Sequence, residues 1–220
     1  MHSTIKNLIN INKQIKSKIA NLDSYKIEPK VIAVSKTFKM DHIAPLIEHG
    51  HKHFGENKVQ EAVEKWTDTK KNNKDLKLHL IGKLQSNKVK FVSGLFDYIH
   101  SLDNEKLAKK ISDEQKNKNW NPKLFIQVNI GNETQKSGMR VDQVENFFEF
   151  CKELKLNIIG LMCIPPINDD PEKSFLRMKY LNKKMNFDEL SMGMSSDYLT
   201  AVEHKATYLR IGSEIFGKRK

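Results

Sequence analysis

The chain contains few of the residues that build disulfide frameworks, metal centres or membrane spans. Only two of its 220 residues are cysteines, Cys151 and Cys163; both lie in apolar surroundings, and their spacing is not typical of a metal site. We therefore expect two buried thiols in a reducing compartment and no disulfide. The sequence has no run of about 18 apolar residues, and its N-terminus lacks the apolar segment of a signal peptide. These absences predict a cytoplasmic protein without a membrane partner.

Arginine is also scarce, although the chain is strongly basic. The formal net charge is +11 at pH 7, but only four of the 38 basic residues are arginines, and the lysines are spread along the whole chain. A nucleic-acid-binding surface usually concentrates its cations on one face. We therefore expect weak nonspecific binding to polyanions and no specific nucleic-acid partner. The terminal GKRK at 217–220 is expected to be a solvated tail.

Linkers rich in glycine, serine or proline are absent, and strand-like segments alternate with segments of helical spacing. The predicted strands are 31–35, 51–54, 76–81, 96–99, 123–129, 157–162, 187–191 and 207–211. The predicted helices are 3–22, 41–49, 57–67, 86–93, 104–117, 141–154, 172–185 and 196–203. Eight alternations predict an α/β fold, a single (β/α)8 barrel of the TIM type, with a doubly wound open sheet as the alternative. We expect residues 1–220 to form one domain, with an N-terminal helix at 1–24 packed on the barrel.

Lys36 follows the first predicted strand, within the segment VIAVSKTFK at 31–39. In barrels of parallel strands, chemistry takes place at the carboxyl ends of the strands. A partly desolvated amine at that end has a lowered pKa and can condense with an aldehyde to give a Schiff base. The alternative is a solvated surface charge, because lysine is very common in this chain.

Small and hydroxyl residues follow the last two predicted strands, in LSMGMSSD at 190–197 and at Gly212 and Ser213. Backbone N–H groups at such positions bind phosphate, and phosphate sites after strands seven and eight recur in barrels. Arg210 lies among apolar residues in the last strand, where it either forms a structural salt bridge or donates to a ring nitrogen or anion. Together with Lys36, these residues predict a socket for a phosphorylated aldehyde such as pyridoxal 5′-phosphate.

Other polar residues leave alternatives open. Asn57 either caps the following helix or contacts a ligand, and a histidine such as His79 on an apolar strand is usually a hydrogen-bonded core residue. Three histidines alternate near the second strand, but no cysteine or acidic partner completes a metal site, so none is predicted. They are His49, His51 and His53.

Ordered motifs run from Val31 to Gly217: VIAVSKTF, HFGENKVQEA, HLIGKLQSNK, IHSLD, QVNIGNETQKSG, LMCIPP, LSMGMSSD and LRIGSEIFG. This set resembles the pyridoxal phosphate homeostasis protein family, single-domain relatives of the N-terminal barrel of alanine racemase. The resemblance implies that pyridoxal phosphate is bound as an aldimine on Lys36. It also implies that Asn57 and His79 lie near the cofactor, that Met162 flanks it, that Arg210 faces the pyridine nitrogen, and that Ser191, Gly193, Ser195, Gly212 and Ser213 line the phosphate region. The chain departs from the family pattern at His204 and Lys205.

The resemblance further implies a carrier or buffer of pyridoxal phosphate, with no catalytic residues, working as a monomer that supplies apoenzymes. The alternative is a racemase-like or transaminase-like enzyme that uses the same cofactor, with Tyr98 as a candidate second base. Racemisation commonly needs two bases, and alanine racemase takes the second from an added β domain. Because this chain ends shortly after the eighth predicted strand, we expect no such domain, which favours the carrier.

Overall fold

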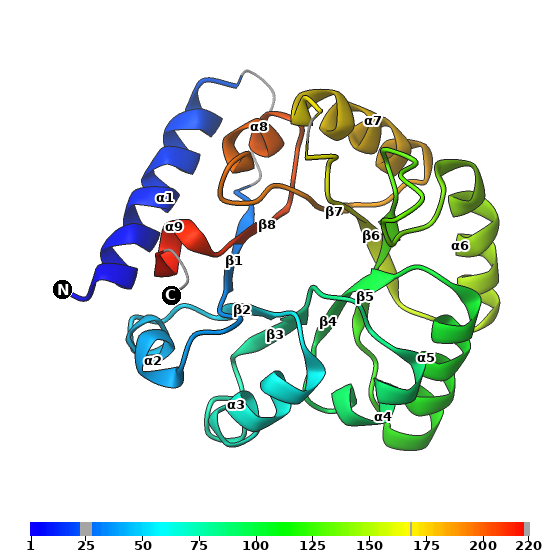
Figure 1. Ribbon diagram of the computed structural model, residues 1–220, viewed down its shortest axis with the longest axis horizontal. Helices are drawn as coiled ribbons and strands as arrows, with labels where there is room; N and C mark the ends of the chain where they lie inside the picture. The colour runs from blue at the N-terminus through cyan, green and yellow to red at the C-terminus, as the bar shows by residue number, and fades with distance from the viewer. Residues whose placement is uncertain (23–27, 168, 218–220) are drawn as a thin grey trace.

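The computed structural model describes residues 1–22, 28–167 and 169–217. Eight parallel strands follow one another around a closed barrel, and the last strand pairs with the first (Figure 1). The strands are β1 (Lys30–Val34), β2 (His53–Glu56), β3 (Lys77–Leu80), β4 (Tyr98–Leu102), β5 (Lys123–Val128), β6 (Ile158–Cys163), β7 (Glu189–Ser191) and β8 (Tyr208–Ile211). The predicted (β/α)8 barrel is confirmed, and closure between β1 and β8 excludes the open sheet.

Helices surround the barrel and connect its strands. They are α1 (Ser3–Ala20), α2 (Met40–Glu48), α3 (Val59–Asn72), α4 (Val89–Val92), α5 (Glu105–Lys118), α6 (Val144–Glu153), α7 (Pro171–Lys184), α8 (Tyr198–Glu203) and α9 (Ser213–Phe216), with 3-10 turns at η1 (Ser86–Lys88) and η2 (Val141–Gln143). The additional N-terminal helix α1 packs on α2, α8 and α9, beside β1 and β8 (Figure 1). Residues 23–24 of the predicted N-terminal segment and 218–220 of the predicted tail lie outside the described residues.

Local sequence signals start and end the helices. At the start of α5, Asn104 Oδ1 accepts a hydrogen bond from Leu107 N at 2.9 Å, and the helix ends at Asn119, whose φ of 47° is left-handed. The buried residues of α5 include Leu107, Ala108 and Ile111, whose spacing places them on one helix face. That face covers the barrel, as the helical pattern predicted.

Alternation along the strands separates the barrel interior from the layer between strands and helices. In β8, Tyr208 belongs to the inner apolar cluster, whereas Leu209 and Ile211 belong to the outer one. Because successive strand residues point to opposite faces, Arg210 faces inward with Tyr208. The interior therefore contains polar as well as apolar side chains, and Arg210 is only 4% exposed.

Two strands differ from their predictions at polar ends. Strand β2 begins at His53 rather than at residue 51, and β4 extends to Leu102 although its prediction ended at residue 99. The end of β4 contains His100 and Ser101, which are polar and yet buried. Hydrophobic patterning did not predict this end, because both side chains are accommodated in the interior of the fold.

Both cysteines are free and buried, as predicted. Burial raises the pKa of the Cys151 thiol and of the Cys163 thiol to about 12, so both stay protonated at neutral pH. Among the described residues, no helix has the length and apolar character that crossing a membrane requires. No cluster of histidine, cysteine or acidic side chains in the described ranges has the arrangement of a metal site.

Candidate functional site

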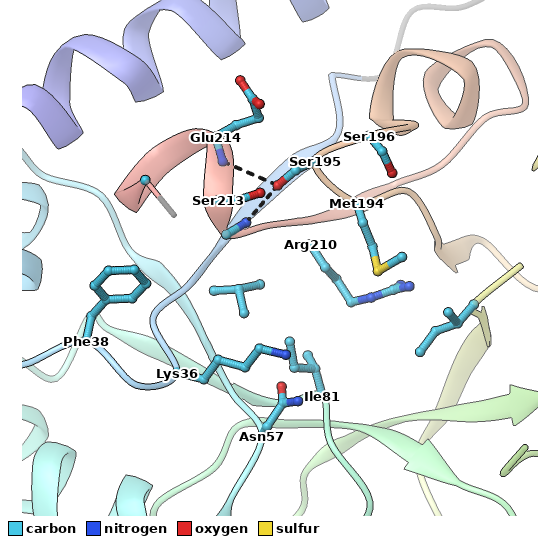
Figure 2. A pocket seen from close by; sticks show the side chains of 14 residues that line it. Lys36, Phe38, Asn57, Ile81, Met194, Ser195, Ser196, Arg210, Ser213 and Glu214 are labelled. Carbon is cyan, nitrogen blue, oxygen red and sulfur yellow. Dashed lines mark hydrogen bonds between the residues drawn. The ribbon is translucent and has the colours of Figure 1, made fainter. Parts of the chain in front are cut away.

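A cavity of about 620 Å³ lies at the carboxyl end of the barrel. Its walls come from the segments that follow β1, β2, β3, β6, β7 and β8, and Figure 2 shows their side chains converging on it. Six of the predicted site residues line the cavity: Lys36, Asn57, Ser195, Arg210, Gly212 and Ser213. The structure therefore brings together residues that are up to 177 positions apart in the sequence (213 minus 36).

The backbone on both sides of Lys36 is held by side chains from β2 and α3. Ser35 is buried, and its Oγ donates to Glu56 Oε1 at 2.7 Å. Thr37 has a left-handed φ of 69°, and its N–H donates to Glu61 Oε1 at 2.5 Å. A β-branched residue rarely adopts this conformation, so the tight turn after Lys36 depends on the contacts that surround it.

Glu56 is the centre of this support. Its Oε1 accepts hydrogen bonds from Lys65 Nζ at 3.0 Å and from Trp66 Nε1 at 2.9 Å, besides the one from Ser35. Lys65 Nζ also donates to Ser35 O at 3.0 Å and to Glu61 Oε1 at 2.8 Å. Burial opposes ionisation of Glu61, but hydrogen bonds from Lys65 and Thr37 outweigh it and lower its pKa. The buried carboxylate and its ammonium partner thus fix the segment that carries Lys36.

Asn57 lines the cavity from the end of β2, and Figure 2 shows it on the same side as Lys36. Helix α3 is capped by Lys58 and begins at Val59, so Asn57 is not its N-cap residue. The buried Asn57 Oδ1 receives no hydrogen bond from the described residues. The Asn57 backbone packs on Gly82, where a Cβ would lie only 2.3 Å from Asn57 O. An acceptor beside the cavity is therefore held in place through its backbone.

The loops after β7 and β8 form another wall of the cavity. Ser195 Oγ accepts hydrogen bonds from Gly212 N at 3.3 Å and from Glu214 N at 3.4 Å, drawn as dashed lines in Figure 2. Ser213 lies beside them. Gly193 does not line the cavity: its φ is 89°, and a Cβ there would lie 2.6 Å from Ala201 Cβ, so it permits the close turn between β7 and α8.

Arg210 reaches the cavity from the barrel interior. Its NH1 group donates to Ser191 Oγ at 2.7 Å, and its NH2 group donates to Cys163 O at 2.8 Å. Burial lowers the pKa of Arg210 from its ordinary value, although such a group stays charged near neutrality. Arg210 forms no ion pair with a carboxylate within the described ranges, so of the two alternatives for this residue the structural salt bridge is not observed there. The guanidinium is instead fixed by a hydroxyl and a carbonyl.

The remaining predicted residues lie in the barrel interior rather than along the cavity. His79, Met162 and Ser191 are fully buried. His79 Nδ1 is 2.9 Å from His100 Nε2, and His100 Nδ1 is 2.9 Å from Ser191 Oγ. His100 was not among the predicted site residues, although it occurs in the motif IHSLD and follows Tyr98 by two positions, the spacing that places both on one strand face.

Comparison with known proteins first defines the class of barrel. A family model described as the N-terminal domain of alanine racemase matches residues 11–220. The alanine racemase of Clostridium difficile has a similar fold, with a TM-score of 0.76 at 15% identity over 99% of this chain and 57% of that chain. The barrel is therefore of the alanine racemase N-terminal class.

Closer relatives define the family within this class. The pyridoxal phosphate homeostasis protein of Vibrio cholerae is 37% identical over 231 residues, which cover 100% of this chain and 98% of that protein. PipY of Synechococcus elongatus, solved with pyridoxal phosphate bound, has a TM-score of 0.81 and 32% identity over 94% of this chain and 100% of that chain. The chain thus belongs to the pyridoxal phosphate homeostasis protein family, and the predicted resemblance is confirmed.

Proposed function

We propose that this protein binds pyridoxal 5′-phosphate in the cavity, holds it covalently on Lys36, and acts as a carrier or buffer in intracellular homeostasis of the cofactor. The observation that carries the proposal is the meeting of Lys36, Arg210 and the loops after β7 and β8 around one cavity. Its volume of about 620 Å³ lies within the usual range for small-molecule sites. PipY, a relative of the same family, has been solved with this cofactor bound.

The residues present fit the chemistry of the group. Asn57 Oδ1, which has no partner among the described residues, supplies a buried acceptor, and Arg210 supplies a cationic donor for the ring nitrogen. For the phosphate, the donors are the hydroxyls of Ser195 and Ser213 and the N–H groups of Gly212 and Glu214, which in this structure donate to Ser195 Oγ. Bound there, pyridoxal phosphate supplies a reactive aldehyde and an electron-accepting ring. In this proposal the interior residues Met162, His79 and Ser191 support the cavity from below, and Gly193 supports it through the turn between β7 and α8.

Lys36 forms the covalent link through its neutral amine. The amine nitrogen attacks the aldehyde carbon, a carbon–nitrogen double bond replaces the carbon–oxygen double bond, and the oxygen leaves as water with the two amine hydrogens. The hydrogen bonds of Ser35 and Thr37 hold the backbone of Lys36 at the cavity wall, so the conformational freedom lost on binding is that of the side chain. No oxidant or second substrate is needed, and the link is reversible by hydrolysis.

A carrier fits the cavity better than a racemase does. Tyr98, considered above as a second base, does not line the cavity; its ring stacks on His79 in the interior with the ring centroids 4.2 Å apart. We propose that the protein works in the cytoplasm as a monomer, since one chain supplies the walls of the cavity, and that apoenzymes dependent on pyridoxal phosphate receive the cofactor from it.

The decisive test is reduction of the loaded protein with borohydride, followed by peptide mapping. Lys36 should carry the reduced pyridoxyl group, and Lys36→Ala should lose both this label and the imine absorbance. Lys39→Ala is the matched control, because Lys39 is exposed three positions away and should leave both signals unchanged. Labelling spread over other lysines, with none at Lys36, would falsify the covalent assignment.

The carrier role has its own test. Protein loaded with the cofactor is mixed with an apoenzyme, either directly or across a membrane that only small molecules pass. Recovery of enzyme activity at the rate of cofactor release supports a buffer, and faster recovery on direct contact supports hand-over between proteins. Rapid exchange of the α-proton of amino acids at the loaded protein would instead favour the racemase-like alternative.

A further inference from the structure

A continuous line of hydrogen-bonded side chains crosses the barrel interior beneath the cavity. It begins at the half-buried His53, where β2 begins, continues through His79 and His100, and reaches Ser191 and Arg210. Each contact between neighbours in the line spans 2.9 Å, except the last, from Arg210 NH1 to Ser191 Oγ, which spans 2.7 Å. His79 and His100 each use both ring nitrogens in these contacts, so neither imidazole has a nitrogen left over.

The direction of donation along this line is set at Arg210. Arginine can only donate, so Ser191 Oγ accepts from its NH1 group. Within the described residues, the other partner of the Ser191 hydroxyl is His100 Nδ1. The Ser191 hydroxyl therefore donates its hydrogen to His100 Nδ1. The reverse direction would leave a buried hydroxyl hydrogen without an acceptor, which is unfavourable.

The direction in which the Ser191 hydroxyl donates determines the tautomers of His100 and His79. If His100 Nδ1 accepts, His100 carries its hydrogen on Nε2 and donates to His79 Nδ1. His79 then carries its hydrogen on Nε2 and donates to His53 Nδ1. Burial lowers the pKa values of His79 and His100 well below the usual value, and the charge of Arg210 adds to the effect on His100, so both rings are neutral as this arrangement requires.

We propose that His53, His79 and His100 are positioning residues for Arg210. They orient the Ser191 hydroxyl so that it accepts from the guanidinium, and they thereby hold Arg210 toward the ligand in the cavity above. The effect on bound pyridoxal phosphate rests on the proposed function, whereas the direction of donation in the line does not. The two parts are therefore tested separately.

The direction is tested on the ligand-free protein by nitrogen NMR of the labelled imidazole rings. We expect His79 and His100 both to show the tautomer with hydrogen on Nε2. Finding hydrogen on Nδ1 of either ring would overturn the proposal, and this result would not depend on whether any cofactor binds.

The positioning role is tested at His53, the end of the line farthest from Arg210. An asparagine places a polar atom near the position of the histidine Nδ1, so His53→Asn keeps an acceptor for His79, whereas His53→Leu removes it. We expect the leucine variant to weaken pyridoxal phosphate binding by about threefold to tenfold and to shift the pH at which the bound imine changes its absorbance. The asparagine variant should restore both properties.

Tyr98→Phe is the matched control in the same interior, because it keeps the ring stacked on His79 and removes only a hydroxyl outside the line. It should leave affinity and absorbance unchanged. Equal behaviour of His53→Leu, His53→Asn and Tyr98→Phe would overturn the proposal. If the wild-type protein does not bind pyridoxal phosphate, the proposed function is refuted. The NMR experiment still decides the direction of donation, because it uses the ligand-free protein.

Discussion

A polar cluster at the amino end of the barrel differs from Asn57 at the carboxyl end in whether its groups pair with one another. At the amino end, Lys30 Nζ donates to Glu189 Oε1 at 3.3 Å and to Tyr208 OH at 3.2 Å, so these groups satisfy one another. At the carboxyl end, the buried Asn57 Oδ1 receives no hydrogen bond from the described residues and lies beside the cavity. Polar groups that pair with one another stabilise a fold, whereas those left around a cavity are available to a ligand. The same strands thus build structure at one end and a site at the other.

The buried histidines between the two ends of the barrel should make the unfolding free energy decrease in acid. Burial lowers the pKa values of His51 and His53 to about 4 and those of His79 and His100 well below the usual value. In the unfolded chain these histidines bind protons below about pH 6.5, while in the folded state they remain neutral. Below that pH, each histidine should remove about 1.4 kcal/mol of unfolding free energy per pH unit.

The measurement is urea unfolding from about pH 7.5 to about pH 5. Stability should be level above the unfolded pKa and should then fall steeply as the pH falls, with a total loss of several kcal/mol. His53→Asn removes one of the titrating groups and should reduce the slope by about one proton. A wild-type stability that does not change across this range would contradict the burial of neutral histidines.

The carboxyl end can be tested by changing Glu56, whose hydrogen bonds fix the turn that carries Lys36. Glu56→Gln keeps the shape of the side chain but removes the buried charge opposite Lys65, and it should lower the unfolding free energy by about 3 kcal/mol. It should also slow formation of the imine, because Ser35 and Lys65 help to fix the turn that carries Lys36. Chemical unfolding and stopped-flow absorbance measure the two effects.

The control for this substitution lies on helix α3, which follows β2. Glu64→Gln changes an exposed residue whose partner is Gln60, so stability and imine formation should both stay near the wild-type values. If Glu56→Gln behaves like Glu64→Gln, the buried carboxylate does not support the site.

A pair of methionine substitutions compares the two ends directly. Arg210→Met removes the donor that faces the cavity and should raise the dissociation constant for pyridoxal phosphate by about 100-fold. Lys30→Met removes a cation of the amino end and should change that constant by less than about twofold. Equilibrium dialysis with both proteins gives the ratio, and similar constants for the two variants would remove the functional distinction between the ends.

Periodicity was sufficient to predict the fold from the sequence, because it reports which faces of helices and strands are buried. It placed all eight strands, but it ended β4 before His100 and started β2 before His53. It also missed α9, whose four residues are too few to show a helical period. These errors arise where a strand carries a buried histidine, or where an element is too short to show a hydrophobic period.

The candidate site could be predicted in part for a related reason. Lys36 and Ser213 follow strand ends, and in a barrel all such ends face one side, so order along the chain predicts that they meet. The depth of Ser191 and His79 could not be predicted in this way. Alternation says that a side chain points inward, but the stagger between strands decides whether it reaches the cavity or lies in the layer below.

The smallest expected changes in stability and affinity distinguish Asn57, which we expect to bind the cofactor, from Asn104, which stabilises a helix. Asn104 Oδ1 caps α5, so Asn104→Ala should lower the unfolding free energy by about 1 kcal/mol and leave cofactor affinity unchanged. Asn57 Oδ1 has no partner among the described residues, so Asn57→Ala should change stability by less than about 0.5 kcal/mol and weaken pyridoxal phosphate binding by about tenfold. Urea unfolding and dialysis on both variants give the four values. If Asn57→Ala loses stability and keeps its affinity, the buried oxygen serves the fold, and the contrast between the two ends of the barrel no longer holds at this residue.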